Sequence, residues 1–497
     1  MTDAVPASER RAVRPGHGTR LWRAGIPIGA GVVLALLPSP PGLAPFAWHY
    51  LALFVAVILT LITEPIPPAG AGLMGVTLAG VLGLAFSPAQ IADPAFKFPA
   101  ESLRWALAGF VNSTVWLIFG AFVFAMGYEK TGLGRRIALM LVKRLGGSSL
   151  GLGYAIAASD LLLAPFTPSN TARSAGAVFP VIDRIPELYG SRPGESPRRI
   201  GSYLMWVAFS TTCVTSSMFL TALAPNLLAI DFVRKATGVH ITWGDWFLSF
   251  LPIGAPLMLV LPWLVYRIYP PQIRSSAEVP KWAAQELAKL GRITRNEAIM
   301  AALVIAALGF WIGGADLIDP AMVALAGISL MIVFALVDWN DIAGNRTGWN
   351  VFISFATLIA LADGLAKVGV IDWIGRGVSA LLAGHSPTLV MTMFVALFFV
   401  VHYMFASLTA HATALMPVML AAGVAVPGMP VRTFAMLMCF SLGLMGVLTP
   451  YATGPAPVYF GSGYIERRDF WRLGLIFGLI FLITLLAIGI PSLMLVS

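Results

Sequence analysis

The chain has 497 residues, of which 58% are apolar and only 11% are charged, and its mean hydropathy is +0.83. Because soluble proteins are about 25% charged, this chain has too few polar residues to cover a water-facing surface. The composition excludes a soluble enzyme, a nucleic-acid-binding protein and a disordered scaffold, and it predicts an all-α polytopic membrane protein.

The net charge of +9 comes from 32 Lys and Arg residues against 23 Asp and Glu residues. In membrane proteins basic residues concentrate in cytoplasmic loops, and here they cluster at the N-terminus and in the stretch 269–296. We therefore predict a cytoplasmic tail at 1–23 and a cytoplasmic linker at 269–296. These segments separate a first half, 24–268, from a second half, 297–497.

Long apolar stretches predict the membrane-spanning helices, since a bilayer core about 30 Å thick needs roughly 20 apolar residues in a straight helix. We expect about eleven transmembrane helices, near 24–37, 48–63, 68–86, 105–127, 201–222, 246–268, 297–313, 318–338, 350–365, 431–449 and 470–496.

Two further apolar stretches, about 145–183 and about 377–420, do not fit simple spans because prolines and polar residues interrupt them. Each is long enough for two half-depth helices joined by a polar tip. Irregular backbone at membrane depth is tolerated only where it is buried in protein or lines a cavity. We therefore predict two re-entrant helical hairpins.

The two hairpin tips carry the same pattern, Ser-x-Thr-Ala followed by a basic residue, at 169–173 and at 407–411. A second helix break follows about 50 residues later in each half. The residues at these later breaks are Ala222, Pro225 and Asn226 in the first half, and Pro450 and Gly454 in the second. Such paired, interrupted segments are typical of inverted repeats, and they indicate the binding site of a secondary transporter.

The polar tips offer hydroxyl and amide groups from Ser169, Asn170, Thr171, Ser407 and Thr409. They hold no carboxylate pair, metal-ligand cluster or nucleophile–base motif, so we predict neither an enzyme nor a metal site. Free N–H groups at the start of a half-helix favour an anion. Two tips that face each other would bind a molecule with an anionic group at each end, and a dicarboxylate has that shape.

Four motifs resemble those of the divalent-anion:sodium symporter family: 63–67 (TEPIP), 119–134 (FGAFVFAMGYEKTGLG), 167–173 (TPSNTAR) and 448–463 (LTPYATGPAPVYFGSG). The likeness runs from about residue 48 to the C-terminus. It is greatest to the branch of citrate/succinate and tartrate/succinate antiporters and 2-oxoglutarate/malate translocators. The resemblance implies a homodimer in which a transport domain moves like an elevator against a scaffold domain. It also implies that Asn170, Thr171, Thr409 and Thr453 contact the substrate.

The second hairpin departs from the family pattern at Leu408. Sodium-coupled members carry Ser-Asn-Thr in both hairpins, whereas leucine neither donates nor accepts a hydrogen bond. Arg173 and His411 each follow the tip serine by one helical turn, so they could balance the charge of a dianion where a symporter uses sodium. Two alternatives stay open, namely that Arg173 is a structural partner of Asp160 and that His411 is a neutral packing residue. We expect His402 to be a packing or interfacial residue.

We therefore predict a sodium-independent, obligatory dicarboxylate antiporter without a cofactor, and a sodium- or proton-coupled symporter is the alternative. Succinate, malate and 2-oxoglutarate are the expected substrates, with citrate and tartrate as further candidates. The expected partners are the dicarboxylate, membrane lipid and a second copy of the chain, but no nucleic acid. We expect a bacterial inner-membrane protein with a cytoplasmic N-terminus. The candidate substrate-binding residues are Ser169, Asn170, Thr171, Ser407, Leu408, Thr409, Thr453 and Pro455.

Overall fold

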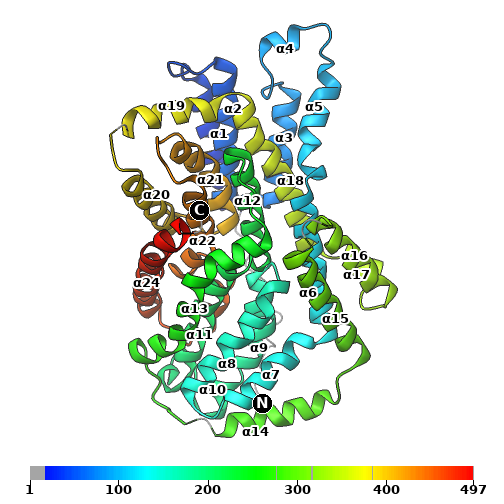
Figure 1. Ribbon diagram of the computed structural model, residues 1–497, viewed down its shortest axis with the longest axis vertical. Helices are drawn as coiled ribbons and strands as arrows, with labels where there is room; N and C mark the ends of the chain where they lie inside the picture. Colours follow the sequence, from blue (N-terminus) through cyan, green and yellow to red (C-terminus); the bar gives the residue numbers. More distant parts are fainter. Residues whose placement is uncertain (1–16, 276, 315–316, 383, 496–497) are drawn as a thin grey trace.

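The computed structural model describes residues 17–275, 277–314, 317–382 and 384–495, which form a bundle of helices (Figure 1). The tail expected at 1–23 lies largely outside these residues. The helices before the linker are α1 (His17–Leu36), α2 (Pro45–Thr63), α3 (Pro68–Val81), α4 (Pro88–Ala92), α5 (Phe98–Leu107), α6 (Ser113–Thr131), α7 (Leu133–Leu145), α8 (Ser149–Leu163), α9 (Phe179–Ile182), α10 (Ile185–Leu188), α11 (Gly201–Met218), α12 (Ala224–Thr237) and α13 (Trp243–Ile268). The later helices are α14 (Glu278–Leu290), α15 (Arg295–Gly313), α16 (Pro320–Val333), α17 (Trp339–Ala343), α18 (Arg346–Lys367), α19 (Val370–Leu382), α20 (Pro387–Val401), α21 (Leu408–Val424), α22 (Val431–Leu444), α23 (Ala456–Gly461) and α24 (Arg467–Met494).

Seven helices in the described part of the chain are long and apolar enough to cross a membrane, and α5 with α6 adds an eighth span if this bent pair is counted as one. Shorter apolar helices accompany them, including α3, α16 and α21. The predicted fold class, an all-α polytopic membrane protein, is confirmed.

The span expected at 105–127 is wrong as a single straight helix. The structure ends α5 at Leu107, continues through the short 3-10 helix η2 (Ala108–Val111), and starts α6 at Ser113, with a bend of 43° between the two parts. Asn112 causes the break, because its side chain accepts a hydrogen bond from the Thr114 amide at 2.8 Å and so caps α6. One asparagine in an apolar stretch hardly changes the mean hydropathy, so the average does not reveal this break.

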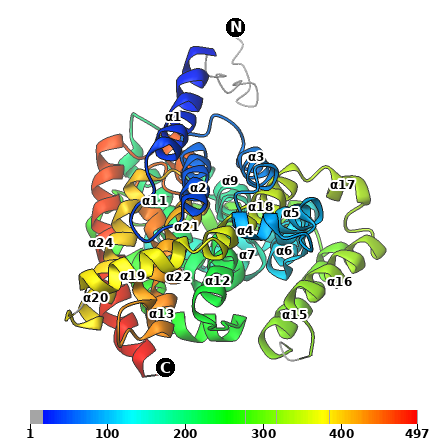
Figure 2. The same ribbon diagram turned by 90° about the horizontal axis from the view of Figure 1, so that it is seen from above.

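Helices from the two halves of the sequence pack against each other. Helix α18 packs against α3 and α6, and α16 also packs against α6, whereas α11 packs against α8, α13 and α22. Figure 1 shows α15 and α16 along one side of the molecule and α13, α20 and α24 along the other. The view from above in Figure 2 shows the same separation.

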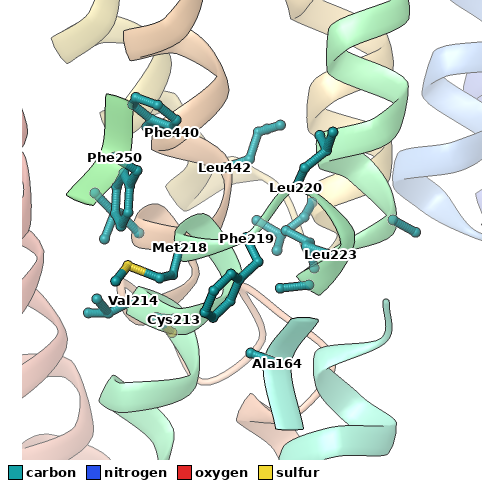
Figure 3. Close-up of a cluster of buried hydrophobic side chains, with 14 of the residues drawn as sticks. Ala164, Cys213, Val214, Met218, Phe219, Leu220, Leu223, Phe250, Phe440 and Leu442 are labelled. Carbon is teal, nitrogen blue, oxygen red and sulfur yellow. The ribbon is translucent and has the colours of Figure 1, made fainter. Parts of the chain in front are cut away.

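Helix α11 lies at the centre of the second group, and every residue from Gly201 to Met218 is buried. Figure 3 shows the apolar cluster at its C-terminal end, where Cys213 and Met218 lie with Phe250 of α13 and Phe440 of α22. Because α11 has no exposed face, its hydroxyl groups must find hydrogen-bond partners inside the protein.

The linker expected at 269–296 contains helix α14, which packs against α7. Next to it, Arg136 of α7 donates to Glu297 of α15 at 2.7 Å, and both side chains are buried. The Arg136 guanidinium also donates to the carbonyl of Gly291 at 2.9 Å. The linker is therefore held against the first half of the chain.

Candidate functional site

The backbone is irregular at both predicted hairpin tips. The first break is at 167–170, between the 3-10 helix η3 (Ala164–Phe166) and the π-helix η4 (Thr171–Val178). The second break is at 405–407, between the 3-10 helix η7 (His402–Met404) and α21. Both breaks leave backbone N–H groups at the start of a helix free of helical partners, which is where an anion can bind.

The tip serines have the same local role in both halves. Ser169 Oγ accepts a hydrogen bond from the Ala172 amide at 3.2 Å, and Ser407 Oγ accepts one from the Ala410 amide at 3.3 Å. Each serine thus caps the helix that follows its break. This local contact fixes the hydroxyl orientation but leaves the hydroxyl hydrogen free to meet a ligand.

The first hairpin tip is joined directly to the break of the second half. Asn170 Nδ2 donates to Thr453 Oγ1 at 2.8 Å, although 283 residues separate them in the chain. Farther along η4, the Ser174 and Tyr459 hydroxyl oxygens are 2.7 Å apart and share a hydrogen bond. Two of the candidate residues, Asn170 and Thr453, therefore form one polar cluster, and both are buried.

The second tip lines a different opening. Ser407 and Thr409 line a cavity of about 150 Å³ with Glu64 and Asn350, which come from the end of α2 and from α18. Leu408 is buried in the apolar core and does not line this cavity. The structure thus brings Ser407 and Thr409 together at this cavity, whose lining does not include Asn170 or Thr453.

Arg173 is surrounded by protein groups on every side and is 1% exposed. Its Nε donates to Asp160 Oδ2 at 3.2 Å. Its Nη1 donates to the carbonyls of Thr167 and Ala222 at 3.0 and 2.8 Å. Its Nη2 lies within 3.3 Å of hydroxyl oxygens of α11. The charge of Arg173 is therefore paired with Asp160, as in the structural alternative of the sequence analysis.

His411 is fully buried and lies against a second histidine. The Nδ1 atoms of His402 and His411 are 3.3 Å apart, and His402 Nε2 is 2.8 Å from the carbonyl oxygen of Ala452. The rings of Phe398 and Phe405 pack edge-on against the His411 ring, with centroids 4.3 and 4.7 Å away. The partners that the structure shows for His411 carry no charge.

The helix-break residues of the first half pack against the first tip and against the end of α11. Ala222 ends the 3-10 helix η6 (Leu220–Ala222), and its carbonyl accepts the bond from Arg173. Asn226 Nδ2 donates to the carbonyls of Ser216 and Phe219 at 2.7 and 3.3 Å, which satisfies the end of α11. Pro225 lies in the first turn of α12, where a missing N–H costs nothing.

The break of the second half lies between the 3-10 helix η8 (Met445–Val447) and α23. Pro450 lies in a turn there, and Pro455 is the N-cap residue of α23. Gly454 lies directly against the side chain of Thr171. Thr171 therefore belongs with the cluster of Asn170 and Thr453.

A larger opening of about 650 Å³ lies beside the first tip and is lined by Ser169 and by residues of α6, α17 and α18. Lys130, at one edge, forms an ion pair with Asp341. Arg346 is the first residue of α18 and is exposed. The lining also includes Glu129, so the opening carries two basic and two acidic side chains together with the N-terminus of α18. With Lys130 paired to Asp341, Arg346 is the basic group of this lining that is left to meet an anion, next to the positive end of the α18 dipole.

Sequence reasoning does not identify Thr212, Thr215 and Ser216 of α11, which surround the Arg173 guanidinium. Their signal is present, because 210–217 reads STTCVTSS and is a run of hydroxyls within a buried helix. Buried hydroxyls need partners, so such a run marks a helix that faces a polar group. Tyr459 has no comparable signal, since it is one aromatic residue in an apolar segment.

A protein-family profile described as "Sodium:sulfate symporter transmembrane region" matches residues 18–496. The L-tartrate/succinate antiporters of Shigella sonnei (strain Ss046) and Escherichia coli (strain K12) are each 48% identical to the chain over 475 residues, which is 95% of this chain and 98% of theirs. Among solved structures, the YdaH transporter of Alcanivorax borkumensis is similar, with a TM-score of 0.56 and 15% identity over 89% of this chain and 98% of that one. MtrF of Neisseria gonorrhoeae is similar as well, with a TM-score of 0.54 and 14% identity over 87% of this chain and 96% of that one. At such low identity these two structures support the fold alone.

Proposed function

The chain belongs to the sodium:sulfate symporter family, whose motifs are those of the divalent-anion:sodium symporters, and we propose that it exchanges dicarboxylates across a membrane. The proposed exchange couples the inward movement of one C4 or C5 dicarboxylate to the outward movement of another, without sodium. Succinate, malate, tartrate and 2-oxoglutarate are the proposed substrates, with citrate as a further candidate.

The observation that carries the proposal is the 48% identity to L-tartrate/succinate antiporters over 95% of the chain. The family profile matches residues 18–496, a range that includes both hairpin tips and both later breaks. We include in the proposal a homodimer with elevator movement of the hairpins, and a place in the bacterial inner membrane with a cytoplasmic N-terminus, as the family likeness implies.

The polar cluster supplies groups suited to a carboxylate. Asn170, Thr171 and Thr453 offer an amide and two hydroxyls from both halves of the chain, next to the free N–H groups at the start of η4. Each helix N-terminus acts as about half a positive charge. We propose that this cluster binds one carboxylate and that Ser407 and Thr409 bind the other after the hairpins move.

The charge balance differs from the one proposed on sequence grounds. Asp160 pairs with Arg173, so this arginine does not present a net charge to a dianion in the structure described. The proposal of exchange rests on the relatives and on Leu408, which offers no polar group for a sodium site.

Proteoliposomes provide the direct test. Vesicles loaded with succinate are expected to take up external labelled tartrate or succinate at the same rate when potassium replaces sodium, and vesicles without internal dicarboxylate are expected to take up almost none. Uptake that requires external sodium and proceeds without internal dicarboxylate would contradict the proposal and favour a sodium symporter. Uptake that collapses when a proton gradient is dissipated would favour a proton symporter.

A pair of variants tests the proposed binding cluster. Asn170→Ala removes the donor to Thr453 and a proposed substrate contact, and we expect exchange to fall at least about tenfold. Asn296→Ala is the matched control, because Asn296 is exposed near the start of α15. Equal exchange rates for the two variants would remove Asn170 from the proposed site.

A further inference from the structure

The two hairpins can be compared residue by residue because their first arms have the same bounds relative to the tip serine. Helices α8 and α20 each have 15 residues, and each is followed by a 3-10 helix of three residues. Ser169 and Ser407 follow these short helices at the same distance in the sequence. By this correspondence Arg173 matches His411, and Asp160 matches Phe398.

In the first half, one side chain connects the hairpin to the later break. Arg173 donates directly to the carbonyl oxygen of Ala222 at 2.8 Å, and Asp160 balances its charge. Ala222 lies three residues before Pro225, which is in the first turn of α12. We call this arrangement of Arg173, Asp160 and the Ala222 carbonyl the Arg173 clamp. It holds the π-helix η4 of the first hairpin against the later helix break of the first half.

In the second half, the side chains of His411 and His402 together connect the hairpin to the later break. The matching acceptor is Ala452, three residues before Pro455 at the start of α23. The imidazole of His411 is shorter than a guanidinium, and His402 bridges the remaining distance, with one ring nitrogen toward His411 and the other 2.8 Å from the Ala452 carbonyl oxygen. A second bond supports the junction, since Tyr451 Oη donates to the carbonyl of Tyr403 at 3.0 Å.

The hydrogen-bond pattern fixes the protonation of both rings. A carbonyl oxygen only accepts, so His402 Nε2 carries a hydrogen and donates to Ala452. In a neutral ring the other nitrogen is then an acceptor, so His411 Nδ1 carries the hydrogen of the shared bond. His411 Nε2 is buried and has no hydrogen-bond partner among the described residues. An apolar ring, Phe398, stands where the first half has the carboxylate of Asp160.

We propose that His402 and His411 are positioning residues that form an uncharged counterpart of the Arg173 clamp and hold Thr453 where Asn170 bonds to it. Ala452 is held by His402, and its neighbour Thr453 receives the hydrogen bond from the opposite hairpin. The two histidines thereby connect the second hairpin to the first through Ala452 and Thr453 of the later break. This role rests on the proposed function, because what the clamp positions is the proposed substrate cluster.

Nitrogen-15 NMR of histidine-labelled protein in lipid bilayers tests the arrangement without any transport measurement. Near neutral pH we expect His402 to give the Nε2–H tautomer and His411 the less common Nδ1–H tautomer, each assigned by the signal lost in the His402→Gln and His411→Asn variants. Two Nε2–H rings, or a doubly protonated ring at either position, would overturn the proposal. This result stands whether or not the protein exchanges dicarboxylates.

A comparison of variants tests the positioning role in proteoliposomes. His402→Gln keeps a donor near the Nε2 position, and we expect exchange within about threefold of the native protein, whereas His402→Leu loses it and is expected to lower exchange about tenfold. If the clamp positions Thr453, Asn170→Ala should cost little more in the His402→Leu background. The control background is Ser102→Ala, which removes a hydrogen bond to the Gly80 carbonyl on α3. In that background Asn170→Ala should lower the exchange rate as much as it does in the native protein. Equal activity of the Gln and Leu variants, or full additivity with Asn170→Ala, would overturn the proposal, whereas a native protein that exchanges no dicarboxylate would contradict only the proposed function.

Discussion

Gly454 lies against Thr171 so closely that a methyl group at position 454 would come within 1.8 Å of the Thr171 hydroxyl oxygen and 3.2 Å of its Cβ. Thr171 is β-branched and therefore stiff at χ1 in a helix, so its side chain does not readily turn away from residue 454. The absence of a side chain at 454 is thus what allows the two halves of the chain to meet at the polar cluster.

We expect Gly454→Ala to lower exchange at least about tenfold and to lower the melting temperature, because one of the two segments must shift. Gly461→Ala is the control, since a methyl group there would have no neighbour within 4 Å. Adding Thr171→Ala to Gly454→Ala should restore the melting temperature to that of Thr171→Ala alone. If the double variant stays as unstable as Gly454→Ala, the close contact is not the cause.

A variant of Asp160 can test whether Arg173 has a structural role or balances the charge of the substrate directly. Both side chains are at most 1% exposed, and breaking a buried ion pair costs about 3–5 kcal/mol. We expect Asp160→Asn to lower the melting temperature strongly in detergent and not to increase the affinity for succinate. An increase in succinate affinity in this variant would show instead that Asp160 screens Arg173 from the substrate. Glu195→Gln, which breaks an exposed pair with Arg192, is the control and should have little effect.

Arg346 at the opening beside Ser169 should assist the approach of dianions. In the described part of the chain it forms no ion pair, whereas its neighbour in the opening, Lys130, is paired with Asp341. We expect Arg346→Gln to raise KM for succinate about threefold at low ionic strength, with a smaller effect at about 0.5 M salt, because salt screens exposed charges. The control is Arg376→Gln, an exposed arginine at a different opening. A change in maximal rate with unchanged KM would contradict this role.

Acidification should loosen helix α14. A hydrogen bond from Lys289 at 2.5 Å, aided by the charges of Lys289 and Arg135, lowers the pKa of Glu286 below its usual value of 4.5. Because the folded pKa is the lower one, these contacts stabilise the folded state above the usual pKa, and this stabilisation is lost as the pH falls through the folded pKa. Lys289 lies in α14 itself, so the attachment of α14 to α7 depends on the ion pair between Glu286 and Arg135, whose oxygen and nitrogen atoms are 3.0 Å apart.

Hydrogen exchange of α14, corrected for the intrinsic effect of pH, should therefore quicken as the pH falls from well above the usual carboxyl pKa of 4.5 to below it. Glu286→Gln should remove this dependence and quicken exchange already at the higher pH. Glu278→Gln is the control, because the Glu278 carboxylate is largely exposed and its ion pair among the described residues is with Lys281 of its own helix. An unchanged profile in Glu286→Gln would assign the effect to another group.

The hairpin tips were predictable because they break the apolar pattern in two ways at once. At 167–170, proline removes a helical hydrogen bond and polar side chains occupy an apolar stretch, and at 407–409 the same triplet spacing recurs. The break at Asn112 has neither repetition nor proline, so nothing in the pattern separates it from a continuous span. Local signals thus located the breaks that recur in both halves.

The pairing of the site residues was not predictable from spacing. Ser169 and Arg173 share a helix face under both roles considered for Arg173, so periodicity alone cannot choose between them. The choice depends on Asp160 and on the hydroxyls of α11, which reach Arg173 only in the folded protein. In the same way, the meeting of Asn170 with Thr453 depends on packing between segments 283 residues apart.

Helix α11 has no surface of its own, and this has a consequence for how the surrounding bilayer can act on the protein. Its hydroxyl run touches only other helices, so no lipid tail or headgroup reaches the groups that hold Arg173. Bilayer thickness or headgroup charge can act on this run only through the helices that pack around α11, among them α8 and α13, which both carry exposed apolar residues. The polar network is thereby insulated from the composition of the membrane in which the protein is embedded.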